Sequence, residues 1–313
     1  MKGDKISTKK AIGETLIELG KENENIFVVD ADIGASTTSL DFQKVFPERH
    51  IDSGIAEQNA CGMAAGLAAC GKIPFVSTYC VFGSMRMGEQ IRQSVCYPNL
   101  NVKFVCSHGG LTPGRDGATH QATEDLGVLT SIPNMTVAMP ADVVAAKALI
   151  RKAAEQYGPV FLRMTRDAVE VIYEEDQQFE LGKAVVLREG TDLSIIANGD
   201  TVRLAIQAAE ELARRGIEAD VLDMHTVKPL DKAAVLNCMR KTGKIVTVED
   251  HNIINGLGTA VASVVCENGG CTVKKIGIPD RFGESASYDE LMQMFGITVE
   301  NIVKTGEELV NGQ

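Results

Sequence analysis

Apolar runs of strand length alternate with helix-period segments through nearly the whole chain of 313 residues. The runs are rich in Val, Ile, Leu and Phe with little apolar–polar alternation, as in IFVVD (26–30), NVKFVCS (101–107) and KIVTVED (244–250). Continuous apolar runs predict strands that are buried on both faces, as in a parallel sheet covered by helices. We therefore predict an α/β fold.

The alternation lapses once, in the charged and polar stretch YEEDQQFELG at residues 173–182. Such a stretch is typical of a linker between domains. We predict a parallel-sheet α/β domain over residues 1–172, a linker over 173–183, and a smaller α/β domain over 184–313. A chain of this length can supply a hydrophobic core for each domain.

Charge and composition exclude several classes of partner. The formal net charge is −11 and no run of Lys or Arg occurs, which argues against a nucleic-acid partner. No apolar stretch approaches the ~20 residues that span a bilayer, and the N-terminus lacks a secretory h-region. The eight cysteines form no CxxC pair, which favours free thiols in the cytoplasm over disulfides or a zinc site.

A glycine-rich stretch, HGGLTPGRDGATHQATED (108–125), follows the predicted strand at 101–107. Ligands of open parallel sheets bind beyond the carboxyl ends of strands, so this position is favourable for a site. The stretch contains His108, Asp116 and His120, which suit acid–base chemistry or the binding of a polar substrate. The alternative is a solvated loop with incidental histidines.

Two other strand ends carry candidate residues. Tyr79, Phe82 and Met85 follow the predicted strand at 73–78, and they form either a shelf for a flat ring or ordinary core. Arg163 and Arg166 lie at the end of the predicted strand at 159–165. An arginine there suits a phosphate or carboxylate, or else makes a surface ion pair.

Several motifs together resemble a known family. GIAEQNACGMAAGLA, FVSTYCVFGSMR and above all SHGGLTPGRDGATHQATEDL resemble the pyrimidine-binding domain of transketolases, a thiamine-diphosphate-binding fold. VLDMHTVKPLD and VEDHNIINGLGTAV are similar to the transketolase C-terminal domain. The resemblance covers nearly the whole chain. It implies the transfer of a two-carbon ketol unit from a ketose phosphate to an aldose phosphate.

The resemblance also implies which residues contact the cofactor, thiamine diphosphate. Glu57 matches the glutamate that hydrogen-bonds N1′ of the aminopyrimidine and favours the tautomer that removes the proton from C2 of the thiazolium. Tyr79 and Phe82 match the aromatic residues that pack this ring, and Met85 stands where a third aromatic residue is usual. Asp32 matches an aspartate near the cofactor at the dimer interface.

Substrate contacts follow in the same way. Asp116 matches the aspartate that reads the α-hydroxyl of the sugar, and His120 matches the histidine beside it, so both join Glu57 as implied catalytic residues. Further substrate contacts are implied for four residues: Lys9, Ser36, His108 and Arg166. Lys9 stands where arginine is usual, which keeps the charge but loses the bidentate fork.

The family binds the diphosphate through a divalent metal held by a GDG motif, and this motif does not occur here: Arg115 precedes Asp116 and Gly117. The resemblance does not extend to the domain that carries the motif, which in the family normally lies N-terminal to the pyrimidine-binding domain. The chain therefore resembles the C-terminal subunit of a split transketolase. This implies a thiamine diphosphate site shared with an N-terminal subunit that holds Mg²⁺ or Ca²⁺, no metal ligand in this chain, activity only with that subunit, and an α2β2 assembly.

Three alternatives stay open. The first is the beta subunit of a 2-oxoacid dehydrogenase, and the second is an enzyme like deoxyxylulose-phosphate synthase. The third is a non-catalytic regulatory or scaffold protein that is a relic of a transketolase gene. GRDGATHQ favours a sugar phosphate, and the presence of Glu57, Asp116 and His120 argues against a relic. The sequence does not identify the donor or acceptor sugar, so the pentose phosphate pathway and a dedicated sugar-degradation route both fit.

Overall fold

Strands and helices alternate along residues 2–312, which are the residues that this computed structural model describes. The strands of the first half are β1 (Lys5–Ser7), β2 (Ile26–Asp30), β3 (His50–Asp52), β4 (Ile73–Ser77), β5 (Lys103–Cys106), β6 (Thr136–Ala138), β7 (Val160–Arg163) and β8 (Ala168–Glu170). Its helices are α1 (Lys10–Glu22), α2 (Gly34–Thr37), α3 (Leu40–Val45), η1 (Pro47–Arg49), α4 (Glu57–Ala69), η2 (Phe82–Arg86), α5 (Gly88–Gln90), η3 (Ile91–Cys96), η4 (Gly114–Asp116), α6 (Asp125–Thr130) and α7 (Val143–Glu155).

The second half repeats the pattern. Its strands are β9 (Val185–Arg188), β10 (Leu193–Ala197), β11 (Ala219–Asp223), β12 (Thr226–Lys228), β13 (Lys244–Asn252) and β14 (Thr272–Ile278). Its helices are η5 (Gly199–Thr201), α8 (Val202–Arg214), α9 (Lys232–Lys241), α10 (Leu257–Asn268), α11 (Tyr288–Met294) and α12 (Val299–Asn311). None of the helices in residues 2–312 is both long and apolar enough to cross a bilayer.

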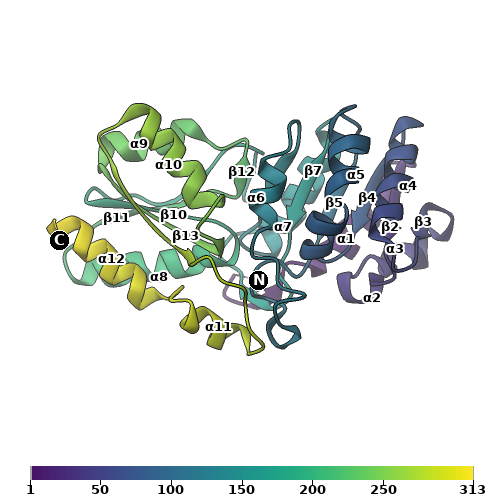
Figure 1. Cartoon of the computed structure of the whole chain (residues 1–313). Helices are drawn as coiled ribbons and strands as arrows, with labels where there is room; N and C mark the ends of the chain where they lie inside the picture. Colours follow the sequence, from purple (N-terminus) through teal and green to yellow (C-terminus); the bar gives the residue numbers. More distant parts are fainter. Residues whose placement is uncertain (1, 313) are drawn as a thin grey trace.

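Each half has its own sheet, and the two sheets lie side by side in Figure 1. The first sheet has the strand order β12-β6-β7-β5-β4-β2-β3, and the second has the order β14-β13-β10-β11-β9. Pairing is parallel except at β12 and β9, which pair antiparallel with β6 and β11. The predicted two-domain α/β fold is confirmed. Strand β12 nevertheless comes from the second half of the chain and completes the first sheet.

Helices cover both faces of each sheet because the strands are apolar on both sides. Helices α1 and α7 pack on one face of the first sheet, and α4, η3 and α6 pack on the other. In the second half, α9 and α10 lie above the sheet in Figure 1, and α8 and α12 lie below it. One cluster of buried side chains runs from α1 into α8 and α12, so the two halves share a hydrophobic core.

The helical stretch that follows β4, residues 82–96, is not one continuous α-helix. It consists of two π-helical segments, η2 and η3, on either side of the short helix α5. Glycines at positions 83 and 88 weaken helix propensity here, and π-helical turns are frequent at functional sites. The sequence prediction also missed short or terminal elements: β1, β8, β9, β12, α2, α3, α11 and α12.

The two halves meet around Arg163, the last residue of β7, whose side chain is fully buried. Its Nε donates to Asp125 Oδ2 at 2.8 Å, and its Nη2 donates to the carbonyls of Ala122 at 2.7 Å and Asp250 at 3.0 Å. Asp250 belongs to β13, and its carboxylate accepts the N–H of Leu111 at 2.9 Å. One guanidinium therefore joins the first sheet, the 108–125 stretch and the second sheet.

The 173–183 segment carries no helix or strand among the described residues, but it is not a free linker. Tyr173 and Phe179 are buried, and their ring centroids are 4.9 Å apart in an edge-on contact. The hydroxyl of Tyr173 donates to Asp223 Oδ2 at 2.7 Å. The segment therefore packs against the second half.

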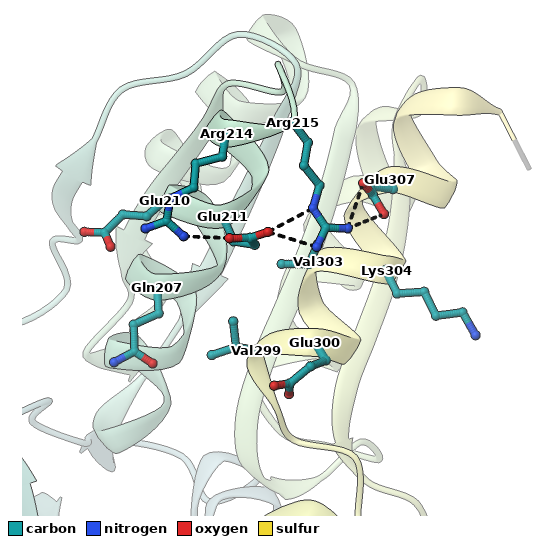
Figure 2. A pocket seen from close by; sticks show the side chains of 10 residues that line it. All are labelled: Gln207, Glu210, Glu211, Arg214, Arg215, Val299, Glu300, Val303, Lys304 and Glu307. Carbon is teal, nitrogen blue, oxygen red and sulfur yellow. Dashed lines mark hydrogen bonds and ion pairs between the residues drawn. The ribbon is translucent and has the colours of Figure 1, made fainter.

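A surface hollow of about 620 Å³ lies between α8 and α12 (Figure 2). Arg215 reaches across it to bind Glu211 of α8 and Glu307 of α12. None of the predicted site residues lines this hollow. It is a helix-packing groove crossed by exposed ion pairs, which contribute little to stability.

We expect Arg163→Met to lower the free energy of unfolding by about 3–5 kcal/mol, because Asp125 keeps a buried carboxylate without its cation. Urea denaturation followed by circular dichroism measures this loss. The matched control is Arg151→Met, which removes half-exposed ion pairs with Glu18 and Glu22 and costs at most about 1 kcal/mol. Equal losses in the two variants would contradict this account of the interface.

Candidate functional site

The site residues follow the carboxyl ends of adjacent parallel strands of the first sheet. Strands β3, β2, β4, β5 and β7 are consecutive neighbours in that sheet. Their carboxyl ends are followed by Glu57, Ser36, Tyr79, His108 and Arg166, in that order. The sheet therefore gathers residues that are far apart in the sequence at one edge, as expected for this class of fold.

Glu57 is the first residue of α4, where the free N–H groups of the helix favour a negative charge. Its side chain is buried, and Arg86 Nη1 donates to Glu57 Oε1 at 2.7 Å. Glu57 and Arg86 line a hollow of about 610 Å³ together with Met85, which is 43% exposed. A buried carboxylate thus faces an open space beside a flexible apolar side chain.

Aromatic rings from two segments, 79–82 and the 108–125 stretch, pack together next to this hollow. The rings of Tyr79 and Phe82 are stacked at 5.6 Å between centroids, with an interplanar angle of 22°. Tyr79 also stacks on His108 at 3.7 Å, and His120 meets Phe82 edge-on at 5.4 Å. Tyr79 and Phe82 therefore form one cluster of rings with the two histidines of the 108–125 stretch.

Arg86 connects the carboxylate to these rings, and the sequence analysis missed it. Its guanidinium lies 4.1 Å from the centroid of the Phe82 ring, within cation–π range, while it binds Glu57. The available signal was its place in FGSMR, four residues after Phe82 and next to Met85. Its partner Glu57 is far away in the sequence, so spacing alone does not identify the pair.

His108 is buried and has a φ of 65°, and its Nδ1 pairs with Ser107 Oγ at 2.8 Å. Burial lowers the pKa of His108 to about 3, and the nearby charges of Lys9 and Arg166 act in the same direction. The imidazole is therefore neutral near pH 7. It can serve as a hydrogen-bonding group but carries no charge for a ligand.

Lys9 and Ser36 are linked to the hydroxyl of Tyr79. Lys9 Nζ donates to the Ser36 carbonyl at 2.8 Å, and Ser36 Oγ pairs with the Tyr79 hydroxyl at 2.9 Å. Burial lowers the pKa of Lys9, and the charge of Arg166 lowers it further. Two cationic side chains thus lie close enough to influence each other, an arrangement that suits an anionic ligand.

Asp116 ends the short helix η4, and its carboxylate accepts a hydrogen bond from Arg166 Nη1 at 2.9 Å. The same Nη1 donates to the carbonyl of Pro113 at 2.6 Å. Both partners of the ion pair are about 39% exposed, so they remain accessible to a ligand. Arg166 thereby ties the glycine-rich turn to the end of β7.

Two residues that the sequence analysis considered for the site, Asp32 and Arg163, make no contact with the ring cluster among the interactions of residues 2–312. Asp32 is exposed and has a φ of 62°, and within residues 2–312 its backbone N–H binds Asp52 Oδ1 at 3.1 Å rather than a residue of the ring cluster. Arg163, one of two arginines considered for anion binding, is fully buried against Asp125 and is not available to a ligand. Arg166 is the accessible arginine of this pair.

The residues present fit the ring portion of thiamine diphosphate. The buried Glu57 carboxylate can accept a hydrogen bond from a ring nitrogen, and the stacked Tyr79 and Phe82 rings can pack a flat heterocycle. For the charged portion, residues 2–312 contain no group of three His, Cys, Asp or Glu side chains that could hold a metal ion. All eight cysteines are free, and five of them are buried.

Two family profiles match the chain. The transketolase pyrimidine-binding domain matches residues 4–171, and the transketolase C-terminal domain matches residues 182–302. The chain also spans about half the length of the single-chain transketolases and 1-deoxy-D-xylulose-5-phosphate synthases that it matches.

Two similar proteins match almost end to end. A putative transketolase C-terminal section of Methanocaldococcus jannaschii is 48% identical, with 95% of this chain and 94% of that protein aligned. A 6-deoxy-6-sulfo-D-fructose transketolase subunit of Clostridium sp. (strain MSTE9) is 42% identical, with 95% and 92% aligned.

A solved structure described as a split-gene transketolase in an inactive β4 tetramer superimposes with a TM-score of 0.91. It is 44% identical and covers 98% of this chain and 99% of that one. Since both domains match and the alignments run almost end to end, the chain belongs to the transketolase family and corresponds to the C-terminal chain of its split members.

Proposed function

We propose that this chain is the C-terminal subunit of a two-chain transketolase that transfers a ketol unit from a ketose phosphate to an aldose phosphate. The observation that carries this proposal is the buried carboxylate of Glu57 beside the stacked rings of Tyr79 and Phe82, in a chain of this family. The assigned domains, 1–172 and 184–313 with the linker between them, and a cytoplasmic location are part of the proposal.

Thiamine diphosphate, when bound, supplies the carbanion chemistry of the reaction, while the protein binds and orients it. Arg86 donates a hydrogen bond to Glu57 Oε1, so Glu57 Oε2 would accept the hydrogen bond from the aminopyrimidine. Tyr79 and Phe82 would pack the ring, with Met85 at the edge of the hollow. Asp32 would approach the cofactor only from the exposed side, at the interface between subunits.

The opposite end of the site would bind the sugar phosphate. Lys9 and Arg166 supply positive charge, and the neutral His108 and Ser36 supply hydrogen-bonding groups. Because Asp116 is bonded to Arg166, recognition of a sugar hydroxyl and of the phosphate would be coupled through one ion pair. His120 would lie beside this pair, edge-on to Phe82.

A separate N-terminal subunit would hold the diphosphate through Mg²⁺ or Ca²⁺ and complete an α2β2 assembly. The similar chain from Clostridium is named as a subunit, and the solved β4 tetramer is described as inactive. Both descriptions fit a chain that supplies only part of an active site. The Clostridium protein is named for a sulfo sugar, so a dedicated sugar-degradation route is a second candidate beside the pentose phosphate pathway.

We expect ketol transfer only when this chain is combined with its N-terminal subunit. The assay uses xylulose 5-phosphate and ribose 5-phosphate with thiamine diphosphate and magnesium, for the pair and for each chain alone. A stable but inactive pair would redirect the search to other ketose donors. Failure to form any complex would contradict the two-chain proposal.

In the assembled pair, Glu57→Ala is expected to lower turnover by about 10²- to 10⁴-fold, the range for loss of a group that assists proton transfer. Size-exclusion chromatography should show that the complex still forms. Glu89→Ala, at an exposed position of the neighbouring helix, is the matched control and should stay near wild type. Substantial residual ketol transfer in Glu57→Ala would remove Glu57 from the mechanism.

Asp116→Ala should lower turnover and alter the preference among ketose donors, while the affinity for thiamine diphosphate stays near normal. The reason is that Asp116 pairs with Arg166 and not with Glu57, the carboxylate proposed to hydrogen-bond the cofactor ring. Steady-state kinetics with two or more donors measure this split. Asp176→Ala, at an exposed linker position, is the control, and unchanged rates with all donors in Asp116→Ala would refute the role.

A further inference from the structure

One segment of the second domain, FGESAS at residues 282–287, contacts the turn that carries Asp116, and we call this segment the brace. Ser285 Oγ donates to the carbonyl of Arg115 at 2.9 Å. Gln121 Nε2 donates to the carbonyl of Glu284 at 2.9 Å and to that of Gly114 at 3.1 Å. The brace is therefore bonded to the turn that carries Asp116.

The brace and the turn pack closely, with side chains of each lying against glycines of the other. A Cβ on Gly117, where φ is +78°, would lie 2.7 Å from Ser285 Oγ. A Cβ on Gly283 would lie 1.7 Å from Gln121 Oε1, which is closer than any real contact. Glycines on both sides of the contact are what allow the brace and the turn to approach so closely.

The turn held by these bonds carries Asp116 and His120, the two residues proposed to contact the sugar. Asp116 lies between Arg115, whose carbonyl binds the brace, and Gly117, which packs against it. The N–H of His120 donates to the Gly117 carbonyl at 3.0 Å, so the position of His120 depends on the same turn. The first domain fixes the Asp116 carboxylate through Arg166, whereas the second domain fixes the backbone beneath it.

The brace is itself anchored to buried residues of both domains. Gln121 is buried, and helix α11 follows the brace directly with a full capping box at Ser287 and Glu290. The hydroxyl of Tyr288, in the first turn of that helix, donates to the buried Asp200. The brace is therefore held at its far end by a rigid element rather than by a free loop.

We propose that the brace positions Asp116 and His120 and thereby sets the selectivity of the site for its ketose donor, with Ser285 and Gln121 as positioning residues. This assigns a role in substrate discrimination to the second domain. It rests on the proposed function, since the donor is the sugar phosphate of that reaction. Small displacements of positioning groups cause large losses in the reactions that they orient.

The test is Ser285→Ala in the complex with the N-terminal subunit. Ser285 is exposed, so the variant should fold, and loss of one hydrogen bond is expected to raise KM for the ketose donor by about two- to tenfold. The change in kcat should be smaller, the ratio of kcat/KM between two donors should shift, and cofactor affinity should not change. Ser285→Thr keeps the hydroxyl and should restore the wild-type values.

The matched control is Ser263→Ala, on the exposed face of α10, whose hydroxyl also donates to a carbonyl, that of Thr259, at 3.1 Å. A second readout needs no activity: amide hydrogen exchange in the isolated chain. Ser285→Ala should speed exchange at Gly117, His120 and Gln121, and Ser263→Ala should not.

The outcomes separate the two proposals. If the wild-type complex transfers a ketol unit from none of the ketose donors, the proposed function fails, and the exchange measurement still decides whether the brace orders the turn. If the wild-type complex is active and Ser285→Ala keeps its donor KM and selectivity, the positioning role is wrong. The positioning role is wrong even if amide exchange becomes faster in Ser285→Ala, because the brace would then order the turn without affecting how the substrate binds.

Discussion

The buried guanidinium of Arg163 is the interaction on which the arrangement of the two domains depends. It neutralises Asp125 and donates to carbonyls of the 108–125 stretch and of β13, so a charge that is costly to bury has partners on three sides. Without this junction the stretch would be an ordinary surface loop. With it, the loop is fixed at its base to both sheets, and Gly110 and Ala122 close that base with paired backbone bonds.

From this junction the candidate site follows from the order of the parallel strands. Neighbouring carboxyl ends bring Tyr79, His108 and Arg166 together, and α4 presents Glu57 beside them. The result is a buried carboxylate and a cluster of rings at one end and two cationic side chains, Lys9 and Arg166, at the other, which is the composition that the proposed shared active site requires. The proposal accounts for the cationic end through the phosphate of the sugar, whereas a 2-oxoacid dehydrogenase or a relic offers no reason for it.

Much of the fold and part of the candidate site were predictable from the sequence, and the features that were missed share physical reasons. Continuous apolar runs predict the parallel strands, and glycines after a strand predict the loop. Strand β12 was missed because three residues are too few to show a pattern, and it pairs with β6 across a distant part of the chain. The Arg86–Glu57 pair and the Gln121–Glu284 bond were missed because their partners are 29 and 163 residues apart. No local pattern marks such contacts, whereas a family motif does mark Asp116 and His120.

The most direct test of the shared site is equilibrium binding of thiamine diphosphate in the presence of magnesium, measured by calorimetry. The titration is done on this chain, on its N-terminal subunit and on the two together. We predict one cofactor bound per copy of this chain in the pair, and much weaker binding to either chain alone. Binding to this chain alone as tight as binding to the pair, or no binding to the pair, would contradict the account.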